Sequence, residues 1–325
     1  MSNKLFVSPS PHVVGDLSSH RIMRDVIIAL LPALAISALY FGYMSLVVSA
    51  VAVASSIFFE YTIRRFMFGE KSVGCDLSPI VTGLLLAFNL PASIPLWIVV
   101  IGSLVAIGIA KMTFGGLGKN PFNPALVGRV FLLIAYPVQM TTFPGVEGVV
   151  DSFSGATPLA AMKSAEAPVE FLASLNFQDM MLGAIPGSMG EVASLLLILG
   201  GIYMLVRRVI TWHIPVAVLG SMALFAVVFG VCGGFGVEDA LRFSAFHILA
   251  GGALLGAIFM ATDYTTSPMT HKGMVIFGVG IGLLTMVIRL WGAYPEGMSF
   301  AILIMNSCVP LINKYVKPTR FGAKK

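Results

Sequence analysis

The segment Asp151-Ser-Phe-Ser-Gly-Ala-Thr157 places a threonine hydroxyl directly after two of the smallest residues. Gly155 and Ala156 leave room for a bulky group to approach Thr157, and a carboxylate lies six positions upstream of the hydroxyl. Such a hydroxyl suits covalent modification by a separate enzyme. The cluster of Ser154, Gly155 and the following proline is also typical of a plain turn. The spacing alone leaves both interpretations open.

A second polar segment interrupts an apolar region at Gly115-Gly-Leu-Gly-Lys-Asn-Pro-Phe-Asn-Pro124. Its backbone donors and the amides of Asn120 and Asn123 are suited to a polar ring or an ion. The alternative is a simple elbow between two helices. Three cations flank the segment: Lys111, Lys119 and Arg129.

Two further groups are candidates for chemistry within apolar surroundings. Asp263, with Thr262 and Thr265, lies at the end of an apolar run and could contribute to an ion path. Arg289 lies near the end of another run. Arginines in such places usually face the interior of a helix bundle or a cavity. Arg289 could there stabilise an anionic group, or its side chain could extend to the membrane interface.

The histidines and cysteines predict no metal centre. His213 and His247 are single histidines in apolar surroundings, which is typical of structural residues. Cys75, Cys232 and Cys308 are far apart and form no CxxC pair, so a zinc or iron–sulfur site held by this chain alone is not expected. Cys75 is the best placed for a site shared with a partner. We predict no catalytic residue.

The elements that position these residues must be membrane helices. Of the 325 residues, 57% are hydrophobic and only 11% are charged, whereas a soluble domain has about 25% charged residues. A membrane helix needs about 20 mostly apolar residues. We predict an all-α polytopic membrane protein with about ten transmembrane helices, at 25–43, 46–64, 77–93, 95–113, 122–139, 190–206, 212–233, 243–262, 273–291 and 298–314. Breaks at Asn89-Leu-Pro91, Asn120–Pro124 and Tyr294-Pro-Glu-Gly297 are candidate site walls or connecting turns.

Positive charge predicts the orientation. With the N-terminus inside, every Lys and Arg except Lys163, Arg242 and Arg289 falls on the inner side. Both termini are then cytoplasmic. The net charge of +5 is thus a topology signal, and no nucleic-acid partner is predicted. We divide the chain into an inner N-terminal segment (1–24), a first five-helix half (25–139), an outside loop (140–189), a second five-helix half (190–314) and a basic inner tail (315–325).

A weak internal repeat relates the two halves. An offset of 178 residues pairs Gly102 with Gly280, Lys111 with Arg289, and Phe122 with Phe300. Five spans per half would make the halves inverted repeats, which usually place a site at their interface. Chance similarity between apolar helices is the alternative.

The motifs also resemble a known family. Asp-x-x-Ser-Gly-Ala-Thr at 151–157 is similar to the flavinylation motif of the NqrB/RnfD family, the membrane subunits of the Nqr and Rnf redox pumps. Family landmarks follow in order along the chain, and the length is closer to the Rnf branch. These landmarks are Ser8-Pro-Ser-Pro-His12, Gly115–Gly128, Gly187-Ser-Met-Gly-Glu191 and Ala261-Thr-Asp-Tyr-Thr-Thr-Ser-Pro268.

The resemblance implies a function. Thr157 would carry FMN as a phosphoester made by a flavin transferase, with Asp151, Ser154, Gly155 and Ala156 completing the motif. A noncovalent riboflavin is implied as well, and Asp263, Thr262 and Thr265 could contact it. Arg289 could stabilise anionic flavin or its phosphate. The chain would relay electrons between ferredoxin and NAD, coupled to Na⁺ or H⁺ transport, beside other Rnf subunits in the bacterial inner membrane. The alternatives are an Nqr-type subunit of a sodium-pumping NADH:quinone oxidoreductase and a small-solute channel or transporter.

Overall fold

The computed structural model describes residues 18–69, 76–143, 157–164, 168–183, 186–190 and 194–318, and these residues form helices without a strand. The first group of helices is α1 (Ser19–Phe41), α2 (Tyr43–Thr62) with the π-helical turn η1 (Ile63–Met67), α3 (Ser78–Phe88), α4 (Leu96–Leu104) continued by η2 (Val105–Met112), α5 (Pro124–Ala135) and α6 (Pro137–Thr141). Three short helices follow: α7 (Pro158–Ser164), α8 (Pro168–Ser174) and α9 (Phe177–Leu182). The last group is α10 (Ser194–Val206), α11 (His213–Cys232), α12 (Val237–Leu249), α13 (Ala253–Leu255) continued by η3 (Gly256–Met260), α14 (His271–Trp291) and α15 (Met298–Tyr315).

Helix lengths and apolar composition confirm an all-α polytopic membrane protein. Within the described residues, four helices are long and apolar enough to cross a membrane, namely α1, α2 with η1, α11 and α14. The bent pair of α12 with α13–η3 adds a fifth candidate. Four shorter apolar helices accompany them: α3, α4 with η2, α5 and α10. Each of the ten predicted runs contains a helix, although several helices are too short to cross a membrane alone.

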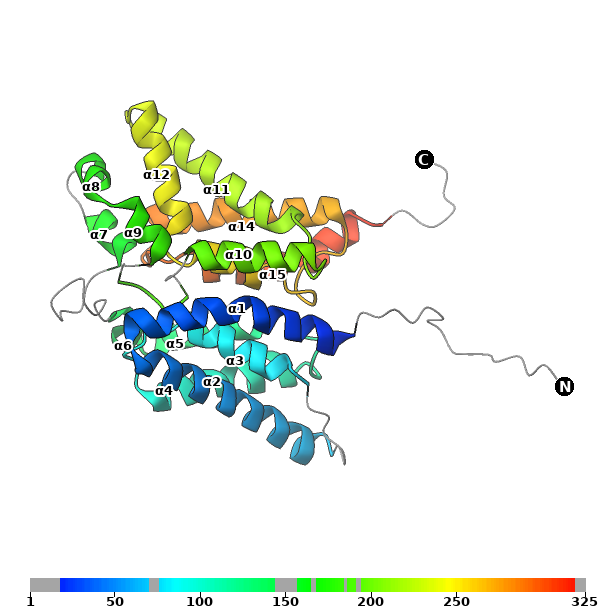
Figure 1. Cartoon of the computed structure of the whole chain (residues 1–325). Coiled ribbons are helices and arrows are strands. Elements are labelled where there is room, and N and C mark those ends of the chain that lie inside the picture. The colour runs from blue at the N-terminus through cyan, green and yellow to red at the C-terminus, as the bar shows by residue number, and fades with distance from the viewer. Residues whose placement is uncertain are drawn as a thin grey trace.

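The helices form two layers, one built from α1–α6 and the other from α10–α15 (Figure 1). In the first layer α2 packs on α3 and α4, and α5 packs on η2. In the second layer α11 packs on α12 and α14, and α14 packs on α15. The layers meet where α1 contacts α10 and where α5 contacts α15. Lys111 and Arg289, paired by the sequence offset, lie near the C-terminal ends of η2 and α14 in their respective layers.

The predicted span at 243–262 is broken in the structure. A helix begins earlier, at Val237, stops at Leu249, and continues from Ala253 after a bend of 63°. The cause is the pair Gly251 and Gly252, whose φ angles of +68° and +63° lie in the left-handed region. A helix cannot continue through two such residues, and glycine adopts them without steric cost.

The predicted break at Asn89–Pro91 is present after α3. The segment that leads into the second layer forms hydrogen bonds with it. The Gly190 N–H donates to the Phe88 carbonyl at 2.7 Å, and the Met189 N–H donates to the Leu90 carbonyl at 3.2 Å. These bonds satisfy carbonyls that the end of a helix leaves unpaired. A Cβ at Gly190 would lie 2.7 Å from the Phe88 oxygen, so only glycine fits this approach.

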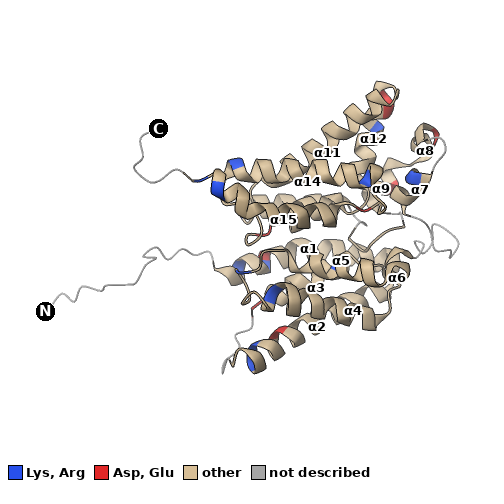
Figure 2. Cartoon of the chain, turned by 180° about the vertical axis from the view of Figure 1, so that it is seen from behind, with Lys and Arg blue, Asp and Glu red and all other residues tan. Residues whose placement is uncertain are grey.

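Charge is unevenly distributed along the molecule. The start of α1 and the end of α15 lie on the same side, and many Lys and Arg residues gather at that end (Figure 2). The short helices α7, α8 and α9 lie at the opposite end (Figure 1). These short helices belong to the predicted 140–189 loop, whose described parts are thus partly helical. They lie away from the start of α1 and the end of α15.

Candidate functional site

Thr157 immediately precedes the short helix α7. Its Oγ1 accepts a hydrogen bond from the Ala160 N–H at 3.3 Å, and its carbonyl accepts one from the Ala161 N–H at 2.9 Å. The side chain therefore acts as an N-cap. The residue is only 4% exposed, and within the described part of the chain its hydroxyl donates no hydrogen bond. The rest of the predicted motif, Asp151, Ser154, Gly155 and Ala156, lies outside the described residues.

Helix α7 is held against the second layer at both of its ends. Near its start, Leu159 packs so closely on Gly251 that a Cβ there would lie 2.1 Å from the leucine Cδ1. Near its end, the Lys163 ammonium donates to the Gly292 carbonyl after α14. Thr157 is consequently fixed beside the bend between α12 and α13.

Arg289 secures the same bend from the inside. The residue is 4% exposed and donates to the carbonyls of His247, Ala250 at 2.9 Å and Gly251 at 3.1 Å. These carbonyls belong to the end of α12, where a helix leaves acceptors unpaired. Arg289 thus faces the bundle interior, as arginines in apolar helices usually do.

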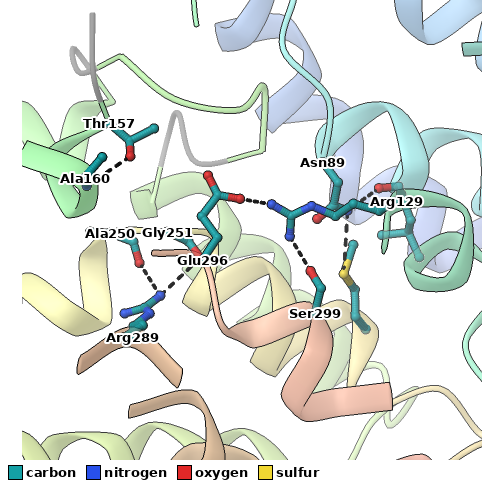
Figure 3. Close-up of polar contacts among 11 residues, drawn as sticks. Asn89, Arg129, Thr157, Ala160, Ala250, Gly251, Arg289, Glu296 and Ser299 are labelled. Carbon is teal, nitrogen blue, oxygen red and sulfur yellow. Dashed lines mark hydrogen bonds and ion pairs between the residues drawn. The ribbon is translucent and has the colours of Figure 1, made fainter. Parts of the chain in front are cut away.

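Arg129 joins the two layers close to this region. It donates to the Glu296 carboxylate, before α15, and to the Ser299 hydroxyl within α15 (Figure 3). The Arg129 Nε has no partner within the described residues. The sequence groups Arg129 with Lys111 and Lys119, but its guanidinium reaches the other layer instead. Glu296 was missed as a partner, although it is the single acid in a predicted break.

The predicted elbow at Asn120–Pro124 also contacts the second layer. Asn123 caps α5 by accepting from the Ala125 N–H at 3.1 Å, and its amide donates to the Met260 carbonyl at 3.1 Å. The Asn120 amide donates to the Thr265 hydroxyl at 3.0 Å. Two segments that the sequence marked separately, 120–124 and 261–268, therefore lie together between the layers.

A pocket opens at this meeting point. It has about 740 Å³ of empty space, part of it continuous with solvent. Polar groups on its wall include Ser78, Lys111, Asn120, Asn123 and Asp263. The remaining wall is largely apolar and comes from α1, α3, η3 and the end of α10.

Asp263 is held on the pocket wall by its neighbours. Its carboxylate accepts from the Thr265 hydroxyl at 2.9 Å and from the Thr266 hydroxyl at 3.2 Å. Burial raises the pKa of Asp263, and these hydrogen bonds partly counteract the rise. Thr262 and Thr265, predicted with Asp263, also line the pocket, so the structure brings this group together.

Lys111 is a buried cation between α2 and α3. It is 2% exposed and donates to the Glu60 carboxylate at 2.5 Å and to the Ser78 hydroxyl at 2.6 Å. Lys119, its predicted companion, is exposed. Glu60 was missed, although an acid within an apolar run is a functional signal in itself.

The remaining candidates make structural contacts. His213 stacks between Trp212 and His271 at the starts of α11 and α14. His247 is buried among Phe243, Phe246 and Arg289. No group of three metal-ligating side chains occurs among the described residues, and Cys232 and Cys308 are free thiols. Cys75 lies outside the described residues.

The chain is similar to known proteins along nearly its whole length. The profile of the "NQR2, RnfD, RnfE family" matches residues 6–322. The D subunit of the Na⁺-translocating ferredoxin:NAD⁺ oxidoreductase complex of Acetobacterium woodii is 42% identical, over 99% of this chain and 96% of the relative. The D subunit of the proton-translocating ferredoxin:NAD⁺ oxidoreductase complex of Clostridium ljungdahlii is 40% identical, over 99% and 98%. The D subunit of an ion-translocating oxidoreductase complex of Erwinia tasmaniensis is 36% identical, over 98% of both chains.

Proposed function

The chain belongs to the NQR2, RnfD, RnfE family, and on this premise we propose that it is the flavin-carrying membrane subunit of an ion-translocating ferredoxin:NAD oxidoreductase complex. The observation that carries the proposal is identity of 40–42% over 99% of the chain to the D subunits of two such complexes. By their names those complexes move different ions, Na⁺ and H⁺, at nearly equal identity to this chain. The coupling ion of this chain is therefore either one of the two.

We propose that Thr157 carries FMN through a phosphoester. The residues present fit this role: the hydroxyl accepts the Ala160 N–H but donates to no described group, so replacing its proton breaks no hydrogen bond among them. The contacts of α7 with Gly251 and Gly292 would hold the attachment point in place. When bound, FMN supplies the one-electron redox chemistry that amino-acid side chains lack.

The pocket between the layers is our candidate for the noncovalent flavin. Its apolar walls match a flat aromatic ring, and the polar side chains on the wall, Lys111 and Asp263 among them, supply the few polar groups that orient a ligand. The pocket is lined by residues of both layers, and ligand sites of inverted-repeat proteins usually occur at such an interface.

The proposed orientation follows from charge. Many Lys and Arg residues gather at the end where α1 begins and α15 ends, which favours a cytoplasmic location for that end (Figure 2). Thr157 would then face the outer side of the bacterial inner membrane. The partners in this proposal are the other subunits of the complex, a flavin transferase and lipid.

The test for the attachment is a pair of substitutions at Thr157, made in the full complex in cells that contain the transferase. Thr157→Ala removes the hydroxyl and the helix cap, while Thr157→Asn removes the hydroxyl but keeps an acceptor that caps helices well. We expect both variants to insert normally and both to lose the fluorescent flavin band on a denaturing gel. Thr142→Ala, directly after α6 and exposed, is the matched control and should keep the band.

The two variants separate attachment from folding. Loss of the band in the alanine variant alone would mean that the cap, not the hydroxyl, is required. A flavin-bearing peptide that does not contain residue 157, identified by mass spectrometry, would refute the assignment of Thr157.

A further inference from the structure

A buried ion pair separates two cavities at the end of the molecule where α1 begins. The Lys111 ammonium donates to Glu60 Oε2 at 2.5 Å and to Ser78 Oγ at 2.6 Å. The two charged side chains are 2% and 5% exposed. Lys111 and Ser78 line the interior pocket described above.

The second cavity is a polar cleft on the other side of the pair. It has about 500 Å³ of empty space, partly open to solvent, and its described wall includes Glu60, Arg64 and Asp76 but not Lys111. Glu60 therefore contacts the cleft, Lys111 contacts the pocket, and the hydrogen bond between them connects the two spaces.

The charges around the pair come from each neighbouring element. Arg64 lies 3.8 Å from Glu60 and 3.1 Å from Asp76, which places a continuous line of charges along the cleft. Asp263 faces Lys111 from the pocket side and interacts with it electrostatically. Such a line can exchange protons with the water of the cleft.

The second layer holds a buried cation of a different kind at the position that the sequence offset of 178 residues pairs with Lys111. Arg289 is 178 residues beyond Lys111, is similarly buried, and donates to backbone carbonyls at the bend before α13. Its guanidinium stays protonated under all conditions in proteins. Lys111 instead has a carboxylate partner, a cleft behind that partner, and an amine that can lose its proton.

A buried ion pair is weak evidence for a purely stabilising role, because removing both charges from water offsets much of their mutual attraction. We propose that Glu60 and Lys111 form a proton relay from the cleft to the interior pocket. This inference rests on the proposed function, because it requires a reducible ligand in that pocket.

The relay would move one proton for each electron that a one-electron donor of the proposed complex delivers to the ligand in the pocket. Lys111 Nζ passes a proton to the pocket ligand that has gained the electron and becomes neutral. Glu60 takes a proton from the water of the cleft at a carboxylate oxygen and passes it to Lys111 Nζ. Both side chains then regain their starting charges, so that the net transfer is one proton from the cleft to the pocket.

The decisive variant is Lys111→Arg. Arginine keeps the charge and can donate to both Glu60 and Ser78, but it cannot release a proton. We expect the complex to assemble with unchanged acid-extractable flavin. Proton uptake from the cytoplasmic side should slow by about a hundredfold, within the range of general acid–base catalysis. Lys119→Arg, an exposed lysine nearby, is the matched control and should behave as wild type.

The measurement uses inside-out membrane vesicles that contain the full complex, with a pH-indicator dye outside. The complex is reduced by rapid mixing with dithionite in weak buffer, and the rate of proton uptake is recorded together with flavin content. Glu60→Gln should slow the same phase.

Each other outcome overturns the relay in a distinguishable way. Normal proton uptake in Lys111→Arg with normal flavin content leaves only a structural role for Lys111, as does loss of flavin in that variant. Normal uptake in Glu60→Gln removes Glu60 from the path. Absence of acid-extractable flavin from the wild type removes both the pocket flavin and the relay, while the covalent band at Thr157 continues to test the attachment separately.

Discussion

The Arg129–Glu296 pair predicts a large and specific loss of stability when one charge is removed. The side chains are only 7% and 11% exposed, and they connect α5 in the first layer to the segment before α15 in the second. In Arg129→Met the Glu296 carboxylate stays buried without its cation, which costs about 3–5 kcal/mol. Glu296→Gln likewise leaves the buried Arg129 guanidinium without its anion, at a similar cost of about 3–5 kcal/mol, although the amide oxygen can still accept one hydrogen bond.

The double variant Arg129→Met/Glu296→Gln buries no unpaired charge. We therefore expect it to lose less stability than the sum of the single losses, with a coupling of roughly 2 kcal/mol, in the range typical of residues in one network. Unfolding in mixed dodecylmaltoside and SDS micelles, followed by the fluorescence of the three tryptophans, measures these free energies.

An exposed pair provides the matched control. Arg242 and Glu238, which are 43% and 79% exposed, bond across one turn of α12. Arg242→Met should change the free energy of unfolding by about 0.5 kcal/mol at most. If Arg129→Met proves no more costly than Arg242→Met, the buried pair does not hold the layers together and the reasoning fails.

Three further substitutions test other parts of the structure. Gly251→Ala should destabilise the protein by more than about 1–2 kcal/mol, because Gly251 has a left-handed backbone and its new Cβ would collide with Leu159. Gly220→Ala is the control and should leave the stability unchanged, because the space around Gly220 is open. Thermal unfolding in detergent compares the two variants. Asn123→Ala should lower the free energy of unfolding by about 1–2 kcal/mol, because it removes the cap of α5. Asn123→Asp keeps a capping oxygen and should keep most of that stabilisation; SDS unfolding measures both. Burial raises the pKa of Asp263 from 3.8 in the folded protein. The free energy of unfolding should therefore fall as the pH rises from about 4 through the folded pKa, because the unfolded chain ionises this carboxyl more readily. Asp263→Asn should remove this fall, as measured by unfolding midpoints over a pH series.

The helices were largely predictable, whereas the bend at Gly251 was not. Apolar length locates a helix, and each predicted run contains one. A run such as 243–262 is apolar on both sides of its break, so hydropathy does not register the break. The signal was the pair Gly251-Gly252, because two adjacent glycines allow consecutive left-handed residues.

The candidate site was predictable only where a motif marked it. Asn120 and Asp263 came from segments with unusual composition, and the structure places both on one pocket. The partners Glu60 and Glu296 belong to elements far along the chain from Lys111 and Arg129, so spacing could not pair them. An acid within an apolar run and an acid within a break were nevertheless visible signals.

The way α3 ends has a consequence for how the protein is made. The carbonyls of Phe88 and Leu90 receive their hydrogen bonds from Gly190 and Met189, about a hundred residues later in the chain. Until the ribosome has delivered that segment, the C-terminal end of α3 is incomplete, and in lipid an unpaired carbonyl costs several kcal/mol. The first layer therefore cannot reach its final form while the second is still unsynthesised. A nascent chain stopped near residue 143 should be a substrate for membrane quality-control proteases, even though all helices of its layer are already present.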